Sequence, residues 1–366
     1  MIETIDYKLQ TRKVRKTYGP VVALAGADIE MREGEFLTLL GPSGSGKTTL
    51  LMAIAGLNDP DDGEIWIDGK LSTYVPAHDR GIGMVFQNYA LFPHMTIFEN
   101  IAFPLRMRKL SMATIRPEVK RVLEIVQLPD VANRYPRELS GGQQQRIALA
   151  RCFVYQPSII LMDEPLGALD KKLRDTLQRE VKHLHQDLGI TVLYVTHDQE
   201  EAMVMSDRIC LMNDAKIEQI GTPQELYFQP RSVFAADFLG ESNLLEATVR
   251  DSTKEATVME FASGAVVLGQ PNAVLNPGDA VRFMVRPESV AVMDAQSAEN
   301  SATGVLKEVI MSGQITKCFL ELPDGSEMVS TRLTQGWDGT GLEPGAEICF
   351  GWSSAHTVVL AEQSGR

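Results

Sequence analysis

Short apolar runs in the first part of the chain alternate with turns and helical stretches. Residues 36–40 (FLTLL) form a compact apolar run that ends at Gly41. Residues 48–55 then predict a helix, with Gly56 as its C-terminal cap. A strand, a glycine-rich turn and a helix in this order are typical of the opening of an α/β sheet.

Residues 88–158 change to a mainly helical pattern. Apolar side chains recur there at the spacing that places them on one helix face: Val119, Val122, Leu123 and Val126. Strand-like runs return at 158–162 (SIILM) and 191–195 (TVLYV), and both are apolar at nearly every position, as buried parallel strands are. The charged stretch 171–188 between them predicts a further helix. The sheet is therefore expected to be interrupted by a helical insert.

After about residue 240, short alternating runs are separated by Pro-Gly, Asp-Gly and Ser-Gly turns, which predict an all-β domain. A faint repeat lies within this region. The segment LNPG at 275–278 recurs as LEPG at 342–345, 67 residues later, and apolar runs follow both copies at 290–293 and 357–360. Two similar β units packed together are the expected arrangement, and a chance match is the alternative.

The 366 residues suffice for two domains, and their net charge of −13 is unevenly spread. Residues 241–366 hold 8 Lys and Arg against 17 Asp and Glu, whereas residues 1–240 hold 27 against 31. Nucleic acid binds through cationic side chains that neutralise its phosphates. The acidic C-terminal part therefore argues against a nucleic acid partner there.

The sequence contains no run of 18 or more apolar residues, and its N-terminus lacks the basic and then apolar pattern of a signal peptide. Four cysteines are scattered without C-x-x-C spacing: Cys152, Cys210, Cys318 and Cys349. Single buried thiols in a reducing compartment suit this distribution better than a metal site does. We therefore expect a cytoplasmic chain, and any membrane role would have to come through partner chains.

Residues 41–48 (GPSGSGKT) match the pattern G-x-x-x-x-G-K-[ST] between the predicted strand and helix. The glycines let backbone N–H groups turn toward phosphate oxygens, and the helix directs its positive end to the same place. Lys47 is expected to reach the β- and γ-phosphates of a nucleotide, and Thr48 to hold Mg²⁺. The alternative is an accidental glycine-rich turn, which the flanking strand and helix disfavour.

A second chemical element is the apolar run 159–162, which leads into Asp163 and Glu164. Carboxylates at the C-terminal ends of strands in an open α/β sheet lie where ligands bind. Asp163 is expected to hold Mg²⁺, and Glu164 to polarise the attacking water as a general base. Two solvated acids at a strand end are the alternative, which the phosphate-binding pattern upstream makes the weaker one.

Residues 139–143 (LSGGQ) narrow the class of ATPase. Ser140 and Gln143 form a capping box that would begin a helix, which is a purely structural explanation. Capping alone does not require Gly141 and Gly142 in a first turn, where glycine is costly, whereas close approach of a phosphate does. At these residues the sequence resembles the ABC ATPase family, whose signature this is, and the resemblance covers nearly the whole chain.

The resemblance implies roles for several further residues. Gln87 is similar to the family's glutamine that senses Mg²⁺ and water, and His197 to its switch histidine, which contacts the γ-phosphate. Tyr18 is similar to the aromatic residue that stacks on adenine. Asp170 lies in a segment similar to the loop that links two active sites. The family more often has serine where Gly167 stands, so hydrogen bonding from that position is in doubt.

The expected site therefore combines residues from the motifs with residues from the resemblance. The expected catalytic residues are Glu164, His197, Lys47 and Gln87. The expected metal ligands are Thr48, Gln87 and Asp163. The residues expected to contact ATP are Tyr18, Gly41, Ser43, Gly44, Ser45, Gly46, Lys47, Thr48, Thr49, Gln87, Ser140, Gly141, Gly142, Gln143 and Asp170. The expected cofactors are ATP and Mg²⁺, and the expected reaction is hydrolysis of ATP to ADP and phosphate.

The family's geometry also implies a homodimer, because Ser140 and Gly142 would face the γ-phosphate held by Lys47 of the second copy. ATP closes such a dimer, and hydrolysis with phosphate release reopens it. An importer subunit fits a lone ATPase chain, whereas an exporter would include a transmembrane domain. Soluble ABC proteins of DNA repair insert long coiled coils between the phosphate loop and the strand-end acids, whereas Gly41 and Asp163 are only 122 residues apart here. ABC proteins of translation carry two ATPase cassettes, whereas this chain has one copy of each motif.

Two further segments resemble parts of importer ATPases. Residues 89–95 (YALFPHM) are similar to the groove that receives a coupling helix from a membrane subunit, with core packing as the structural explanation. The C-terminal β region resembles the tandem OB-like (TOBE) domain of polyamine, ferric iron, sulfate and maltose importers, with FLGESN at 238–243 and VRPE at 285–288 as landmarks. OB folds often bind nucleic acid, so a soluble ABC ATPase acting on nucleic acid is the remote alternative.

The expected fold is an α/β P-loop NTPase (ABC ATPase) core with a helical subdomain and a C-terminal all-β, OB-like (TOBE) domain. Residues 1–238 form the ATPase domain in this scheme. Its RecA-like core spans 1–87 and 159–238, and its helical subdomain spans 88–158. Residues 239–366 form the β-rich domain, to which we assign a regulatory or subunit-contact role.

The resemblance implies partners besides the second copy. These are two integral membrane permease subunits and, through them, an extracytoplasmic solute-binding protein, which would place the chain peripherally at the cytoplasmic face of the inner (plasma) membrane. No nucleic acid partner is expected. The overall sequence is most similar to ATPases of spermidine/putrescine importers. Ferric iron, phosphonate, opine, sulfate and sugar stay open as cargo, because this subunit need not touch the cargo.

Overall fold

The computed structural model describes residues 7–87, 89–167, 171–261, 264–272, 275–292, 298–335 and 343–361. The chain divides into two compact units, Met1–Pro223 and Gln224–Arg366. In the described part of the chain, no helix combines the length and the apolarity that crossing a membrane requires. The domain boundary expected after residue 238 stays a prediction.

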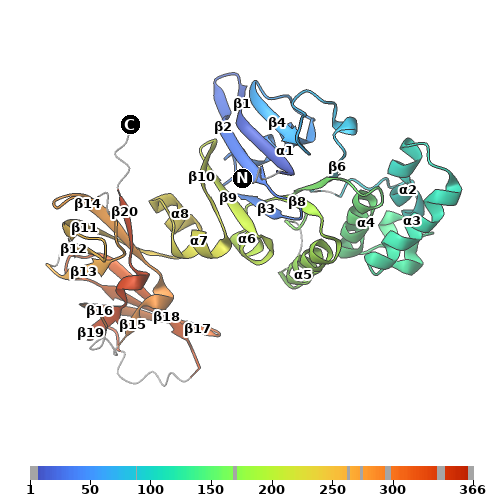
Figure 1. Ribbon diagram of the computed structural model, residues 1–366. Coiled ribbons are helices and arrows are strands. Elements are labelled where there is room, and N and C mark those ends of the chain that lie inside the picture. Colours follow the sequence, from blue (N-terminus) through green and yellow to red (C-terminus); the bar gives the residue numbers. More distant parts are fainter. Residues whose placement is uncertain are drawn as a thin grey trace. The chain divides into compact units, whose positions relative to one another are not determined.

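A six-stranded sheet of order β10-β9-β3-β8-β7-β6 is the central layer of the first unit (Figure 1). Neighbouring strands in this sheet run parallel, except for the pair β9 and β10, which is antiparallel. The central position of β3 follows from its composition, since all its residues are buried. The strands are β3 (Phe36–Leu40), β6 (Ile82–Val85), β7 (Ile159–Asp163), β8 (Thr191–Thr196), β9 (Arg208–Asn213) and β10 (Lys216–Gly221).

A second, antiparallel sheet of order β2-β1-β4-β5 lies in the same unit. Its strands are β1 (Leu9–Tyr18), β2 (Val21–Met31), β4 (Asp62–Ile67) and β5 (Lys70–Leu71). Helix α1 (Lys47–Ala55) contacts β2 of this sheet and also β7 and β8 of the parallel sheet. One apolar core therefore joins α1 to both sheets, with Leu24, Leu50 and Leu193 among its buried members.

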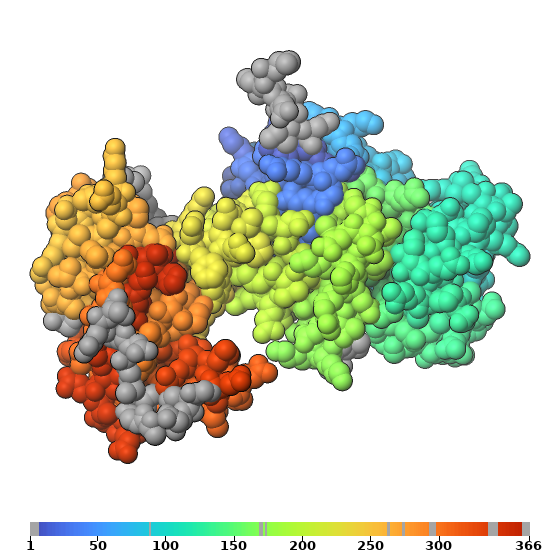
Figure 2. All heavy atoms as spheres, turned by 60° about the horizontal axis from the view of Figure 1, so that its bottom comes forward, coloured from blue at the N-terminus to red at the C-terminus, as the bar shows by residue number. Residues whose placement is uncertain are grey.

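Helices cover the other face of the parallel sheet. The helical insert consists of α2 (Ile97–Met107), α3 (Met112–Ile125) and α4 (Gly141–Phe153), and α5 (Lys171–Leu188) and α6 (Gln199–Met205) follow β7 and β8. A second core contains Tyr194 of β8, Val122 of α3, Ile147 of α4 and Val181 of α5. Figure 2 shows the teal surface of α2 and α3 beside the green surface of α5.

The second unit contains two five-stranded antiparallel sheets of matching order, β13-β12-β11-β14-β20 and β18-β17-β16-β19-β15. Its helices are α7, which begins at the unit boundary (Pro223–Phe228), and α8 (Val233–Phe238). The first sheet comprises β11 (Asn243–Ser252), β12 (Thr257–Phe261), β13 (Val266–Gly269), β14 (Ala280–Val285) and β20 (Val358–Ala361). The second comprises β15 (Ala291–Val292), β16 (Asn300–Ser312), β17 (Ile315–Glu321), β18 (Glu327–Leu333) and β19 (Glu347–Trp352).

The predicted repeat in this unit is confirmed, and it includes an exchange of strands. Gly278 and Gly345 end matching turns with φ 93° and 91°, and their N–H groups bond the carbonyl oxygens of Val249 and Leu306. β15 follows β14 in the chain but pairs with β19, and β20 follows β19 but pairs with β14. Each half therefore completes the other half's sheet, and both line one core.

The predicted fold class is confirmed. The strand expected at 36–40 and the helix expected at 171–188 have the predicted bounds, and α1 begins one residue earlier than expected, at Lys47. Gly56 caps α1 with φ 75°, and its N–H bonds the carbonyl oxygen of Ala53. The helical insert over 88–158 is likewise present as α2, α3 and α4.

Candidate active site

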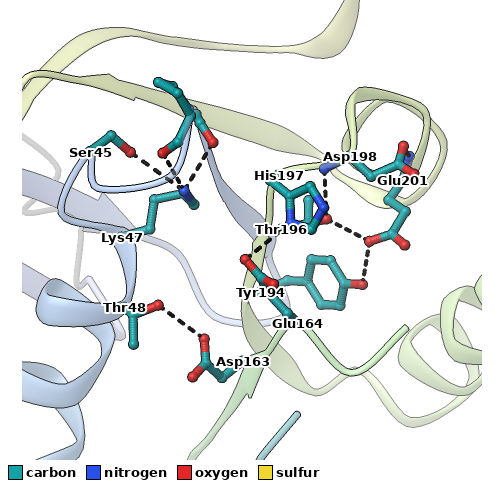
Figure 3. A network of polar contacts seen from close by, with 12 residues as sticks. Ser45, Lys47, Thr48, Asp163, Glu164, Tyr194, Thr196, His197, Asp198 and Glu201 are labelled. Carbon is teal, nitrogen blue, oxygen red and sulfur yellow. Dashed lines mark hydrogen bonds and ion pairs between the residues drawn. The ribbon is translucent and has the colours of Figure 1, made fainter. Parts of the chain in front are cut away.

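Three neighbouring parallel strands bring Lys47, Glu164 and His197 to one edge of the sheet (Figure 3). Leu40, the last residue of β3, pairs with Thr196 of β8, and Asp163 of β7 pairs with Val195. The phosphate-binding loop follows β3, and His197 follows β8. Asp163 is the last residue of β7, and Glu164 comes directly after it. This edge is where ligands bind in open parallel sheets.

Steric contacts require glycine at two positions of the loop between β3 and α1. Gly41 has φ 155°, and a Cβ added there would lie 2.1 Å from the carbonyl oxygen of Met212. Gly46 has φ 101°, and its Cβ would lie 2.4 Å from the carbonyl oxygen of Ala23. Gly44 has φ 83° but open space around it, so only its backbone conformation favours glycine.

The first turn of α1 continues this loop. The helix's first backbone hydrogen bond runs from Leu50 N–H to Gly46 O at 2.9 Å, so the N–H groups of residues 47–49 precede it and carry the helix's positive end. Thr49 is half-buried in this turn, whereas Ser43 in the loop is exposed and Ser45 is buried. An anion such as phosphate is the ligand that this geometry favours.

Lys47 lies at the centre of the site and is buried. Its Nζ donates to the carbonyl oxygens of Gly41 at 2.9 Å and Pro42 at 2.8 Å, both in its own loop (Figure 3). Burial lowers the pKa of Lys47, while the charges of Glu164 and Asp163 act in the opposite direction. The loop therefore holds a cation where phosphate oxygens would lie.

Thr48 and Asp163 meet across the site, with Thr48 Oγ1 donating to Asp163 Oδ1 at 3.3 Å. Thr48 is exposed at the start of α1 and Asp163 half-buried at the end of β7. Burial is the main cause that raises the pKa of Asp163, and the neighbouring charge of Glu164 adds to it. A hydroxyl and a carboxylate are the oxygen ligands that Mg²⁺ accepts, so these two side chains fit the expected metal position.

Glu164 and His197 form the second contact of the site, with Oε1 and Nδ1 3.2 Å apart (Figure 3). Glu164 has φ 44°, a left-handed conformation that costs a non-glycine residue about 1 kcal/mol. Two backbone hydrogen bonds hold it there, from Glu164 N–H to Val195 O at 3.0 Å and from Gly167 N–H to Glu164 O at 3.4 Å. This strained backbone places the Glu164 carboxylate just beyond the end of β7. Strained backbone conformations of this kind cluster at functional sites.

A polar network joins the two residues that flank His197, and sequence reasoning did not find it. The carboxylate of Glu201, buried on α6, accepts hydrogen bonds from Tyr194 and Thr196, both at 2.7 Å. Asp198 caps α6 by accepting from Glu201 N–H at 3.2 Å. These partners come together only because α6 folds back over β8.

Gln87 follows β6, the neighbour of β7, and is exposed. The loop after it has two residues in the left-handed region, Tyr89 with φ 60° and Ala90 with φ 47°. The guanidinium of Arg151 in α4 donates to both of their carbonyl oxygens, at 2.9 and 2.8 Å. The buried amide of Asn100 in α2 holds the next part of the loop through the backbone of Phe92. The helical insert therefore fixes the course of this loop.

The LSGGQ segment begins α4. Ser140 is the N-cap, and its Oγ accepts from Gln143 N–H at 3.3 Å while Gln143 Oε1 accepts from Ser140 N–H at 3.0 Å. The capping box is thus present. Ser140 is exposed, Gly141 half-buried and Gly142 buried. The N-terminal end of a 13-residue helix therefore faces the surface with a serine at its tip.

Tyr18 ends β1 and is 49% exposed, as a stacking platform must be. Its hydroxyl accepts a hydrogen bond from the amide of Asn58. Asp61 holds the strand end just before it, accepting from the N–H and the hydroxyl of Thr17, both at 2.7 Å, and from Lys16 at 3.0 Å. These bonds, that of the Thr17 hydroxyl above all, lower the pKa of Asp61 to about 2.

Asp170 lies outside the residues that the structure describes, as do Ala168 and Leu169. Gly167, where the family more often has serine, is exposed. A Cβ added there would approach only the carbonyl oxygen of Glu164, at 3.7 Å, which is an ordinary contact. The backbone would therefore accept the family's serine.

Comparison with known proteins adds independent findings. Residues 24–167 match the family model described as ABC transporter, and residues 283–360 match the TOBE domain. The spermidine/putrescine import ATP-binding protein PotA of Aliivibrio fischeri is 42% identical over 352 residues, which cover 96% of this chain and 95% of that protein. The protein of the same name from Escherichia coli (strain K12) is 43% identical over 359 residues, covering 97% and 95%.

Solved structures agree with these matches. The cbiO1 protein of Clostridium perfringens, part of the ABC transporter complex cbiONQ, has a TM-score of 0.57 and 28% identity over 60% of this chain and 90% of its own. The ATP-binding cassette MJ0796, in a dimeric post-hydrolysis state bound to ADP and Pi, has a TM-score of 0.52 and 36% identity over 59% and 98%. The expected family is thereby confirmed: this chain belongs to the ABC transporter family, as an ATP-hydrolysing subunit of the importer type with a C-terminal TOBE domain.

Proposed function

We propose that this ATPase powers the import of a polyamine of the spermidine/putrescine class. The observation that carries the proposal is the identity of 42% and 43%, over nearly the whole chain, with proteins named for spermidine/putrescine import. Similarity of this extent includes the C-terminal β region as well as the ATPase motifs. Ferric iron, phosphonate, opine, sulfate and sugar are the competing cargoes.

Binding of ATP begins at the loop between β3 and α1. Lys47 exchanges its bonds to Gly41 O and Pro42 O for bonds to the β- and γ-phosphate oxygens. Because both arrangements satisfy the ammonium group, the exchange requires a local rotation and no refolding of the loop. The N–H groups at the start of α1 take further phosphate oxygens, and Tyr18 stacks on the adenine.

Thr48, Asp163 and Gln87 would hold Mg²⁺, which in such sites neutralises charge on the β- and γ-phosphate oxygens. The contact of 3.3 Å between Thr48 and Asp163 supports this assignment. Gln87 comes from a different strand end, and its loop is held by Arg151 of α4. We propose that Gln87 completes the ligand set when the helical insert moves toward the core.

Hydrolysis requires a base for the attacking water and a group that fixes the γ-phosphate. We assign the first role to Glu164 and the second to His197. The contact of 3.2 Å between them supports the pairing, since His197 can orient the carboxylate while its other nitrogen faces the phosphate. The left-handed backbone of Glu164 holds the carboxylate at the strand end in advance.

A second copy of the chain completes each site. We propose that Ser140, Gly141, Gly142 and Gln143 contact the γ-phosphate held by Lys47 of the other copy. The exposed N-terminal end of α4 supports this, because it offers a positive helix end and a hydroxyl group to an anion. Two such sites form at one isologous interface.

The chain works at the cytoplasmic face of the plasma membrane on two permease subunits, which an extracytoplasmic binding protein loads. We assign the permease contact to the surface around residues 89–95, where Pro93 and His94 are exposed and Arg151 and Asn100 fix the backbone. Motion of the helical insert on ATP binding then moves this surface. Residues 239–366 act as a regulatory domain and bind no nucleic acid.

The test is ATPase activity of the full-length chain copurified with its permease subunits in lipid. Each candidate binding protein is added with and without its cargo. We expect a binding protein loaded with spermidine or putrescine to stimulate hydrolysis, and the Glu164→Gln chain to show no stimulation.

Stimulation by a binding protein loaded with iron, phosphonate, opine, sulfate or sugar would replace the cargo and leave the importer mechanism intact. Hydrolysis that responds to nucleic acid, and to none of the binding proteins, would overturn the importer proposal.

A further inference from the structure

The buried carboxylate of Glu201 is hydrogen-bonded to residues of β8 that lie close to His197. Tyr194 and Thr196 are two residues apart on β8, so their side chains point to the same face of the strand. Their hydroxyl groups both donate to Oε2 of Glu201, each at 2.7 Å (Figure 3). Glu201 is only 2% exposed, and Tyr194 is fully buried.

The residue after His197 joins the same network. Asp198 N–H donates to Thr196 Oγ1 at 3.0 Å, and Asp198 Oδ1 accepts from Glu201 N–H at 3.2 Å. Both neighbours of His197 are thus bonded to each other and to Glu201. The side chain of His197 is itself 56% exposed and contacts Glu164. The network therefore fixes the backbone on each side of a side chain that is free to meet a ligand.

Arg174 closes the network from a different helix. Its Nη1 lies 2.8 Å from Asp198 Oδ2, and its Nε lies 3.8 Å from Glu201 Oε1. Arg174 is in the first turns of α5, four residues after Asp170. One guanidinium thus bridges the cap of α6 and its buried carboxylate to the start of α5.

We propose that Glu201 and Arg174 are positioning residues for His197, and that they set the orientation of its imidazole relative to Glu164 and the γ-phosphate. This inference rests on the role proposed above for His197. Three charged side chains and two hydroxyl groups hold the loop, which fits the need of hydrolysis for an imidazole within a fraction of an ångström of its partners. Since Arg174 belongs to α5, a movement at the start of that helix would shift the loop of His197 through the Arg174 side chain.

The test is a double-mutant cycle on steady-state ATP hydrolysis by the full-length chain. Arg174→Met removes the guanidinium, and Glu201→Gln keeps an oxygen for Tyr194 and Thr196 but turns an amide N–H toward Arg174. We expect each to lower kcat by about tenfold to a hundredfold while KM for ATP changes by less than about twofold. Arg174→Lys should recover part of the loss.

Coupling to His197 separates positioning from a merely structural role. In the His197→Ala background, Arg174→Met should lower kcat by no more than about twofold further, since the group that it positions is already absent. A full additional loss there would overturn the inference, as would unchanged kcat in both single variants. A fall in nucleotide affinity, or in the midpoint of unfolding, that parallels the fall in kcat would also overturn the inference. The two residues would then act only by stabilising the fold.

Matched controls lie beside both residues. Arg179 is exposed on α5 and its guanidinium donates to the Asp175 carbonyl on the same helix, so Arg179→Met should keep kcat. Glu200 precedes Glu201 and pairs with Lys171 at the surface, so Glu200→Gln should keep it as well. Unchanged kcat in His197→Ala alone would overturn the role proposed for His197 and this inference with it. An effect of His197→Ala without one from Arg174 and Glu201 would overturn only the inference.

Discussion

Individual glycines near the phosphate loop have different reasons for being glycine. Gly41 is confined by the carbonyl oxygen of Met212, Gly44 only by its own φ of 83°, and Gly167 by neither. The sequence motif marks Gly41 and gives no indication of this difference, because the obstructing carbonyl belongs to β9, far along the chain. Substitutions at the three positions should therefore differ in cost.

Alanine at Gly41 should destabilise the fold most, because a Cβ 2.1 Å from a backbone oxygen forces the loop or β9 to shift. We expect the free energy of unfolding to fall by about 3 kcal/mol or more for Gly41→Ala and by about 1 kcal/mol for Gly44→Ala. Gly167→Ser should leave it unchanged. Urea unfolding of the three variants measures this order, and equal losses at positions 41 and 44 would contradict it.

The charged carboxylate of Asp163 is expected to lower the stability of the folded protein. Its folded-state pKa is raised above 3.8, chiefly by burial, so the folded protein loses stability relative to a neutral side chain as the pH rises from 3.8 through the folded value. Asp163→Asn should therefore unfold at a higher temperature than the parent at pH 7, and this gain should vanish below pH 3.8. Hydrolysis should fall about a hundredfold or more, because the proposed Mg²⁺ ligand is lost.

Thermal unfolding at several pH values checks the sign. The control is Asp175→Asn, an exposed site on α5, where no comparable gain is expected. A lower unfolding temperature for Asp163→Asn at pH 7 would show that the carboxylate stabilises the fold, contrary to this expectation.

Elements are held at their ends by charged side chains as well as by caps. Arg80 is buried and donates to the carbonyl oxygens of Ala53 and Ile54 at the end of α1, and of Thr73 and Val75 in the preceding loop, at 2.7–2.8 Å. A cation at a helix C-terminus also complements the helix dipole. Arg80 thus caps the C-terminal end of α1, the helix whose first turn we propose to bind phosphate.

Arg80→Met should lower the free energy of unfolding by about 3 kcal/mol, because four carbonyl oxygens, three of them in buried hydrogen bonds, lose a charged donor. Urea unfolding provides the measurement, and Arg116→Met, at an exposed position of α3, serves as the matched control. Equal midpoints for the two variants would mean that water replaces the guanidinium at no cost.

The elements that the sequence predicted well are those with an unbroken apolar pattern. β3, β7, β8 and α5 fall where expected because burial on two faces, or one apolar stripe, determines them locally. The exchange of β15 and β20 between the two sheets of the C-terminal unit was not predictable, since two equivalent halves offer the same pairing partners. The repeat in the sequence predicted two similar halves but did not predict how their strands pair.

The site shows the same division. Lys47, Thr48, Asp163 and Glu164 could be proposed from the sequence, because the chemistry expected of them depends on their spacing along the chain. Glu201 could not, because its importance comes from hydroxyl groups that α6 reaches by folding back. Spacing along the chain therefore suggests which residues would touch a ligand, and contacts in space suggest which residues would position them.

At the scale of the whole molecule, the proposed sharing of each site between two copies means that ATP should control the oligomeric state. The full-length Glu164→Gln chain should be monomeric without nucleotide and dimeric with Mg²⁺ and ATP, since it binds ATP and does not turn it over. Adding Ser140→Arg should abolish the dimer, because a bulky cation then occupies the approach of the partner's phosphate. Light scattering after size exclusion measures the mass.

Ser111→Arg is the matched control, because Ser111 is likewise an exposed N-cap, of α3. It should cost similar helix stability and leave the ATP-dependent dimer intact. A dimer that survives Ser140→Arg, or that fails equally with Ser111→Arg, would count against the shared site.

The position of β3 in the middle of its sheet has a consequence for how the protein is made. Its two neighbours, β8 and β9, begin 151 and 168 residues after Leu40. At the usual speed of translation, the newly made strand FLTLL waits roughly 8–30 s for its first partner. During that time five residues destined for a fully buried place stay without a sheet, and the phosphate loop has no fixed strand to start from. Recovery of folded protein should therefore depend on the rate of synthesis and on the cell's capacity to shield nascent apolar chain.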